Sequence, residues 1–166
     1  MPRRSIRPAP LVVALAVALV AAFHLTGRAQ LARASSTPMS SPTVTRTVWD
    51  SVYSTAQATR GDSLYRQTCS KCHGEALTGG VSPAGDDAPP LAGAAFLANW
   101  NGQTLYDLYD KVLNAMPPDN PKTLDKQLIV DVMANVLSKN GFPAGATELA
   151  NDPAALKGIQ FQTTKP

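Results

Sequence analysis

Apolar residues in the middle of the chain recur at helical spacing in three stretches. The first stretch runs from about Ser54 to Lys71. The second follows Thr104, an N-cap candidate that has Asp107 three residues later in the manner of a capping box. The third begins at Thr123 and ends near Lys139-Asn140-Gly141, where a basic residue and a glycine are typical of a helix end. The spacing predicts three helices with these inward residues: Ala58, Leu64, Tyr65, Leu105, Leu108, Val112, Ile129, Val132, Met133, Val136 and Leu137.

Gly61 lies in the middle of the first predicted helix. A glycine in a helix interior costs about 1 kcal/mol relative to alanine. We therefore expect Gly61 to allow another helix to approach closely.

The 26 residues between His73 and Trp100 are rich in Gly, Pro, Ala and Asp and show little periodicity. A loop of this length is unusual in a compact domain unless it has a function. Three helices would also form a thin core for about 90 residues. We expect a large, flat, apolar cofactor to organise this loop and to complete the core.

The first 34 residues contain five arginines and no acidic residue, with an uncharged run from Leu11 to Leu25 between the arginines. Ala32-Arg33-Ala34 is a small-residue site of the kind that signal peptidase cuts. The pattern predicts a signal peptide over residues 1–34 and export to the periplasm. An uncleaved N-terminal anchor is the alternative, although the run is short for a membrane span of about 20 residues.

The rest of the chain divides by composition. Residues 35–48 are rich in Ser, Thr and Pro, which is typical of an extended tether. Residues 49–143 have the composition of a folded domain. Residues 144–166 have few large apolar side chains, so we expect a C-terminal arm that lies on the domain or is loose in solvent.

Removal of the leader changes the charge of the chain. Ten Lys and Arg residues then remain against twelve Asp and Glu residues, a net charge of −2, so the isoelectric point of 9.0 describes the precursor. No basic patch remains to indicate nucleic-acid binding.

Cys69-Ser70-Lys71-Cys72-His73 has the C-x-x-C-H spacing of c-type haem attachment. Residues three apart lie on one face of a helical turn, so the two thiols can add to the two vinyl groups at one edge of a porphyrin. The imidazole of His73 then lies beneath the iron as the proximal ligand. The motif predicts one covalently attached haem c.

Other uses of a cysteine pair fit less well. A thioredoxin-like motif needs a βαβ context, and no β-branched strand pattern precedes Cys69. A structural zinc site needs four ligands, whereas the chain after residue 34 has two cysteines and one histidine. A plain disulfide would leave His73 without a role.

The sixth iron ligand must be a methionine, a less usual donor such as Lys or Tyr, or nothing, because His73 is the one histidine after the leader. Met39 lies in the tether, and Met133 belongs to the apolar stripe of the third helix. Met116 follows a helix and directly precedes Pro117-Pro118, which would stop that helix and stiffen the loop. We predict Met116 as the ligand; the alternative is that it only packs at a helix end.

The chain resembles a class I cytochrome c domain over roughly residues 49–143. It is especially similar to bacterial monohaem cytochromes that partner or are fused to quinoprotein alcohol dehydrogenases. The resemblance implies an all-α, class I cytochrome c fold, with three or more helices wrapped around one covalently attached haem and a long irregular loop. It rests on these residues: Ala58-Thr59-Arg60-Gly61, Tyr65, Cys69 to Gly74, Gly79-Gly80, Pro90-Leu91-Ala92-Gly93, Phe96, Trp100 and Met116-Pro117-Pro118.

The resemblance also implies roles for single residues. Pro90 would offer its carbonyl to the second ring nitrogen of His73, a bond that fixes a ligating imidazole. Leu91 would pack on the porphyrin. Trp100 would reach a propionate or line the pocket; a core aromatic is the alternative. Asn135 departs from the family pattern, which usually has an aromatic residue in the last helix.

The leading hypothesis for function is a diffusible or tethered electron carrier, not an enzyme. A haem with two strong axial ligands has no open position for a substrate, and His/Met ligation raises the reduction potential. Its partners would be periplasmic redox proteins, such as a quinoprotein dehydrogenase as donor and a terminal oxidase as acceptor. The alternatives are a haem subunit of a larger dehydrogenase complex and a five-coordinate haem enzyme or gas sensor.

Overall fold

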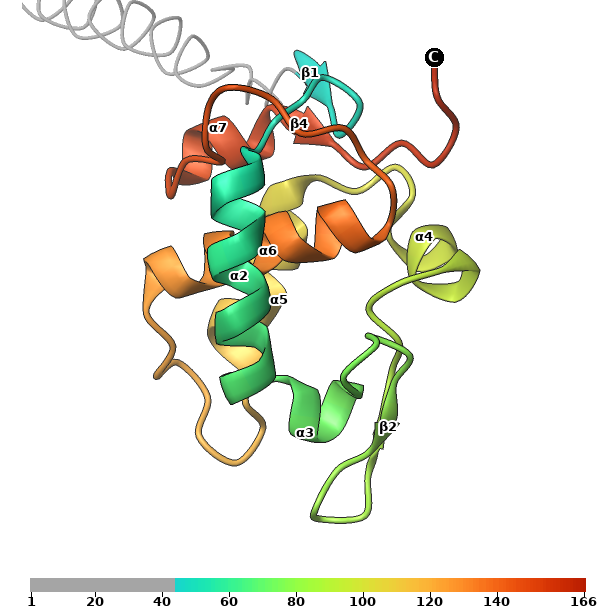
Figure 1. Ribbon diagram of the computed structural model, residues 1–166, viewed down its shortest axis with the longest axis vertical. Coiled ribbons are helices and arrows are strands. Elements are labelled where there is room, and N and C mark those ends of the chain that lie inside the picture. Colours follow the sequence, from blue (N-terminus) through green and yellow to red (C-terminus); the bar gives the residue numbers. More distant parts are fainter. Residues whose placement is uncertain (1–43) are drawn as a thin grey trace, which may run out of the picture. The chain divides into compact units, whose positions relative to one another are not determined.

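The computed structural model describes residues 44–166. The predicted signal peptide and residues 35–43 of the predicted tether lie outside the described residues. The helices are α2 (Thr55–Thr68), α3 (Ser70–His73), α4 (Ala94–Trp100), α5 (Leu105–Ala115), α6 (Lys126–Lys139) and α7 (Pro153–Lys157). The strands are β1 (Arg46–Thr47), β2 (Gly80–Val81), β3 (Asp87–Ala88) and β4 (Ile159–Gln160). Figure 1 shows that helices form most of the ordered structure, which confirms the predicted fold class.

The helices α2 and α6 cross at Gly61 (Figure 1). A Cβ atom added to Gly61 would overlap the backbone carbonyl of Asp131 and would lie 3.1 Å from the Cβ of Asn135. The prediction that Gly61 permits a close helix approach is therefore confirmed. Asn135 is buried at this crossing, in the place where the resemblance led us to expect an aromatic residue.

We expect Gly61→Ala to lower the free energy of unfolding by about 1–3 kcal/mol, because the added methyl group overpacks the crossing. Helix propensity alone predicts the opposite sign, a gain of about 1 kcal/mol. Ser63→Ala on the exposed side of α2 is the matched control. Chemical denaturation of the two haem-loaded variants distinguishes the effects, and an increased stability of Gly61→Ala would contradict the packing argument.

Local hydrogen bonds account for the helix ends. The capping box of α5 is present as predicted, with the Thr104 hydroxyl accepting from the Asp107 N–H and the Asp107 carboxylate accepting from the Thr104 N–H. The prediction that the third helix begins at Thr123 is wrong. Asp125 is the N-cap, because its carboxylate accepts from the backbone of Gln127 and Leu128, whereas the Thr123 hydroxyl donates to an earlier carbonyl.

The first predicted helix ends at Thr68 rather than at Lys71. The Ser70 hydroxyl donates to the Arg66 carbonyl at 2.7 Å and so takes an acceptor that a continuous helix would give to a backbone N–H. The chain turns at Cys69 and continues as the short helix α3.

The segment between His73 and Trp100 is more regular than the sequence predicted. The strands β2 and β3 pair as an antiparallel hairpin, and the seven-residue helix α4 takes up the last six residues of the segment together with Trp100. Phe96 of α4 is 3 % exposed and joins the hydrophobic core. Seven residues are too few for helical periodicity to stand out, which is why the sequence did not indicate this helix.

Residues 144–166 pack on the domain. Four of their apolar side chains are buried: Leu149, Leu156, Ile159 and Phe161. The strand β4 pairs in parallel with β1, and Val48 is fully buried. Both flanking segments therefore contribute to the core of the folded unit, and the C-terminal arm lies on the domain, which is one of the two arrangements expected for it.

Polar side chains of α2 hold the C-terminal segment in place. The amide of Gln57 accepts from the Leu149 N–H at 2.7 Å and donates to the Leu149 carbonyl at 3.0 Å. Arg60 bridges Asp131 of α6 and Glu148 of the C-terminal segment. The hydrogen bond from Arg60 lowers the pKa of Glu148 below its ordinary value.

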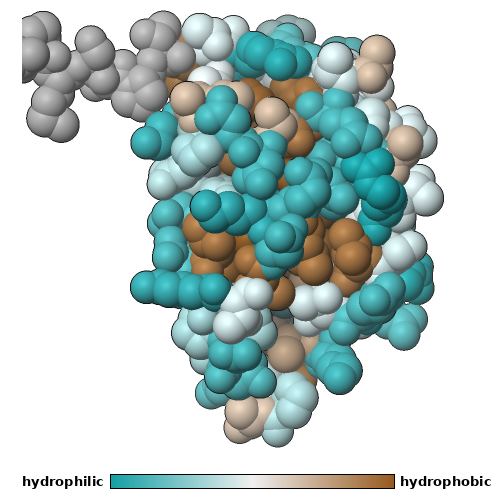
Figure 2. All heavy atoms as spheres, turned by 90° about the vertical axis from the view of Figure 1, so that its left-hand side faces the viewer, coloured by the Kyte–Doolittle hydropathy of each residue, from teal (hydrophilic) through white to brown (hydrophobic). Residues whose placement is uncertain are grey.

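The surface of the domain is mainly polar. Among residues 44–166, the exposed large apolar side chains are Val44 and Val81. Figure 2 shows one face, on which apolar atoms group near the middle and hydrophilic residues surround them. No helix in this part of the chain is both long enough and apolar enough to cross a membrane.

Candidate functional site

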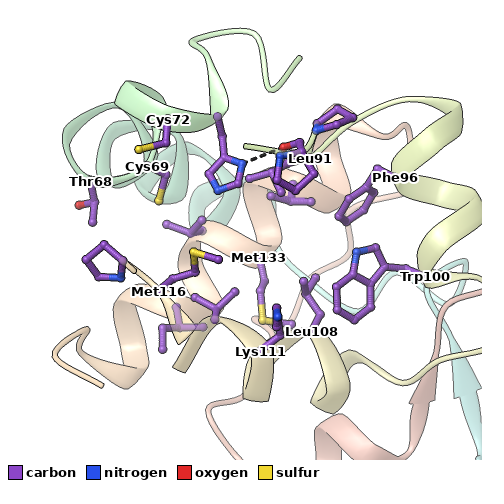
Figure 3. A pocket seen from close by; sticks show the side chains of 18 of the residues that line it. Thr68, Cys69, Cys72, Leu91, Phe96, Trp100, Leu108, Lys111, Met116 and Met133 are labelled. Carbon is purple, nitrogen blue, oxygen red and sulfur yellow. Dashed lines mark hydrogen bonds between the residues drawn. The ribbon is translucent and has the colours of Figure 1, made fainter. Parts of the chain in front are cut away.

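An apolar cavity of about 470 Å³ is lined by residues of α3, α4, α5 and α6 and by the loops before α4 and after α5. Figure 3 shows Cys69 and Cys72 at one end of this cavity and Trp100 at the other. All the site residues predicted from the sequence contribute to its lining: Cys69, Cys72, His73, Pro90, Leu91, Trp100 and Met116.

The two cysteines lie within one helical turn. The backbone N–H groups of Cys72 and His73 both donate to the Cys69 carbonyl, at 3.2 and 3.0 Å. The Tyr65 hydroxyl donates to the Gly74 carbonyl at 2.6 Å and so ties the end of this turn to α2. The motif is therefore held in one shape, with both side chains at the same end of the cavity (Figure 3).

Burial raises the pKa of the Cys69 thiol to about 11, and the neighbouring Cys72 acts in the same direction. Redox-active C-x-x-C motifs work in the opposite way, because they lower the pKa of their attacking thiol. A raised thiol pKa is the reverse of what a thioredoxin-like pair needs.

The imidazole of His73 is oriented by a backbone carbonyl. Its Nδ1 atom lies 2.8 Å from the carbonyl oxygen of Pro89. When Nδ1–H donates to this carbonyl, Nε2 carries the free lone pair and can bind a metal ion.

The prediction that Pro90 supplies this carbonyl is wrong. Pro89 precedes another proline and is therefore restricted to extended backbone. Consecutive carbonyl groups of an extended chain point to opposite sides, so the carbonyl groups of Pro89 and Pro90 cannot both face His73. Pro90 lies in the cavity lining, next to Leu91, whose N–H donates to the Leu77 carbonyl at 2.8 Å.

Two methionines reach the cavity (Figure 3). Met116 is the C-cap of α5, and its N–H donates to the Val112 carbonyl at 3.0 Å. Met133 is 2 % exposed within α6 and belongs to the core, as its helical spacing predicted. Met116 differs because it ends a helix and is half-buried beside Pro117.

The family comparison agrees with this geometry. Residues 56–134 match the family model described as cytochrome c oxidase, cbb3-type, subunit III. This region is a cytochrome c domain. Its Cys69/Cys72 pair binds one covalently attached haem c. The domain exchanges electrons with redox protein partners. No curated protein and no solved structure matches the chain.

The cavity of the cytochrome domain fits a haem. Its volume lies within the range of about 300–1,000 Å³ that is usual for cofactor pockets. The lining is largely apolar, which suits the two faces of a porphyrin. A pair of thiols and an oriented imidazole lie together at one end, where attachment and iron ligation are both needed.

Trp100 lines the cavity and also packs in an aromatic cluster. Its ring centroid lies 6.2 Å from that of Phe96 and 6.4 Å from that of Phe161. Phe161 comes from the C-terminal segment, so this segment supports the wall of the cytochrome pocket. The pocket-lining and core interpretations of Trp100 both hold.

Several lining residues were missed from the sequence. Phe96 was named only as part of the family resemblance, although its position four residues before Trp100 could have indicated a lining role, because two aromatics at this spacing share a helix face. Leu108 and Met133 were predicted as core residues, and they lie in the core and the cavity wall at once. The contact of Pro89 with His73 spans 16 residues and has no local signal.

Proposed function

We propose that this protein is an exported electron carrier whose haem iron is ligated by His73 and Met116. The observation that supports the proposal most directly is the bond between His73 and Pro89, which leaves one imidazole nitrogen free inside a cavity that Met116 also lines. In this proposal Cys69 and Cys72 hold the macrocycle, while Leu91 and Trp100 pack against it.

The haem would supply a one-electron Fe(III)/Fe(II) couple. The chain would then set the properties of that couple. The Pro89 carbonyl holds the His73 ring in one orientation and raises its basicity as a ligand. The apolar lining excludes water, and a thioether from Met116 would raise the reduction potential. Two strong ligands leave no open position for a substrate, which favours electron transfer over catalysis.

The optical spectrum of the purified holoprotein tests the ligand pair. Fe–S ligation gives a weak band near the red edge of the oxidised spectrum, and we expect this band to be present. A high-spin spectrum without the band would instead support the five-coordinate enzyme or gas sensor.

The proposed electron donor is a periplasmic quinoprotein dehydrogenase, and the proposed acceptor is a terminal oxidase. Charged residues near the attachment motif are few and of mixed sign: Arg66, Lys71 and Glu75. Arg66 is already paired with Asp62 at 2.9 Å. A surface of this kind supports brief contacts guided by shape, because strong steering needs a patch of one sign.

We therefore expect reduction by such a dehydrogenase to depend only modestly on ionic strength. Stopped-flow reduction at low and high salt measures this dependence. Absence of transfer at every salt concentration would remove this class of donor. A rate that collapses with added salt would indicate a charged docking face elsewhere on the domain.

A second candidate is a haem subunit of a larger complex. The name of the matched family, an oxidase subunit, supports this possibility. Purification of the protein from its native membrane and periplasmic fractions separates the two candidates. A free carrier elutes alone, whereas a subunit co-elutes with catalytic chains in a fixed ratio.

A further inference from the structure

The polar groups of the cavity are unevenly distributed. None of its lining residues in the described part of the chain is acidic, and Lys111 is the one lysine or arginine among them. Figure 3 shows Lys111 beside Leu108, on the side of the cavity away from Cys72. Lys111 is exposed and also lines the cavity, a position in which a lysine can lay its apolar stem along the wall and keep its ammonium group in water.

The register of α5 explains this position. Leu108 and Lys111 are three residues apart and therefore share one face of the helix. Leu108 is 5 % exposed, which shows that this face turns toward the interior. A lysine on the rim of the same face can cover the cavity and still keep its charge in water.

The side chain of Lys111 has no carboxylate partner within residues 44–166, where the ion pairs of lysine and arginine involve Arg60, Arg66 and Lys139. The two nearest acids along α5 have other partners. Asp107 accepts from Thr104 in the capping box, and Asp110 accepts from Asn114 at 2.9 Å. The ammonium group is therefore available to an anion that enters the cavity.

A haem brings two such anions. Its vinyl groups and its propionate carboxylates lie at opposite edges of the porphyrin, so attachment at Cys69 and Cys72 directs the propionates to the far side of the cavity. We propose that Lys111 binds a haem propionate through a charge-assisted hydrogen bond. This inference rests on the proposed placement of the haem and adds a residue that holds its opposite edge.

Such a pair would affect the reduction potential in a predictable direction. The oxidised haem carries one more positive charge than the reduced haem. A nearby ammonium group that offsets a propionate therefore favours the reduced form, and its removal favours the oxidised form. An arginine at the same position would keep both the charge and the hydrogen bond.

The test uses the holoprotein with Lys111→Gln, Lys111→Glu and Lys111→Arg, and Lys126→Gln at the exposed start of α6 as the matched control. At a fixed ambient potential, we expect the ratio of oxidised to reduced haem to rise about threefold in Lys111→Gln. In Lys111→Glu we expect about tenfold, which is 59 mV for a one-electron couple. Lys111→Arg and the control should match the parent protein.

The redox-induced infrared difference spectrum shows whether Lys111 is paired with a haem propionate or acts on the reduction potential only as a distant charge. We expect the propionate carboxylate band to shift in Lys111→Gln and Lys111→Glu but not in Lys111→Arg or the control. An unshifted band overturns the pairing, whatever the potential does. If covalent haem and the Fe–S band are present while the carboxylate band does not respond, this inference fails and the proposed function stands. If the parent protein lacks covalent haem, both fail.

Discussion

Cys69→Ala and Cys72→Ala are each expected to leave little holoprotein in the periplasmic fraction. The two thiols lie within one helical turn at one end of the cavity, and one remaining thioether would have to hold the haem during export and folding. The haem also completes the core, since the helices α4, α5 and α6 surround an apolar cavity of about 470 Å³. Loss of attachment should therefore lower both the yield of covalent haem and the stability of the domain.

Mass spectrometry of the exported product measures covalent haem directly. Lys71→Ala is the matched control, because Lys71 lies between the two cysteines and its side chain is exposed. We expect this control to carry a normal amount of haem. Normal haem content in both cysteine variants would contradict the attachment mechanism.

The features that could be predicted from the sequence depend on local interactions. The capping box of Thr104 and Asp107 involves residues three apart, and the structure has it as predicted. The C-x-x-C-H motif is likewise complete within five residues, and its spacing alone places two thiols on one side of a turn. The role of Gly61 could be predicted because a glycine inside a helix lowers the stability of that helix by a known amount.

The features that could not be predicted depend on contacts between distant residues. The choice between Pro89 and Pro90 is decided by which carbonyl faces a ring 16 residues away in the chain. The C-terminal segment looked weakly apolar, yet Phe161 is fully buried against three aromatic residues of two other segments. Its anchoring by Gln57 spans 92 residues. Composition within a short window contains no information about such partners.

The candidate site combines residues that the sequence could identify with a spatial arrangement that it could not. Each predicted residue was identified separately, by motif, by elimination or by family resemblance. The fold brings all of them to one cavity, although they come from four separate stretches of the chain. Their convergence supports the proposal more strongly than any single residue does, because independent arguments lead to the same place.

Met116→Ala is expected to give a folded haem protein with a lower reduction potential and a new affinity for external ligands. A soft thioether favours ferrous iron, so its loss favours the ferric form. Axial ligand identity contributes to a range of about 0.8 V among haem proteins, and we expect a decrease on the order of 100 mV or more. The band of Fe–S ligation should disappear from the oxidised spectrum at the same time.

Met133→Ala provides the control, because both methionines line the cavity and the two variants remove the same side chain. Met133 is 2 % exposed within α6, so its truncation should leave a cavity and lower the free energy of unfolding by about 2–5 kcal/mol. Its spectrum should keep the Fe–S band, and its potential should move far less than that of Met116→Ala. If Met133→Ala instead loses the band while Met116→Ala keeps it, the ligand lies in α6 and the loop after α5 has only a packing role.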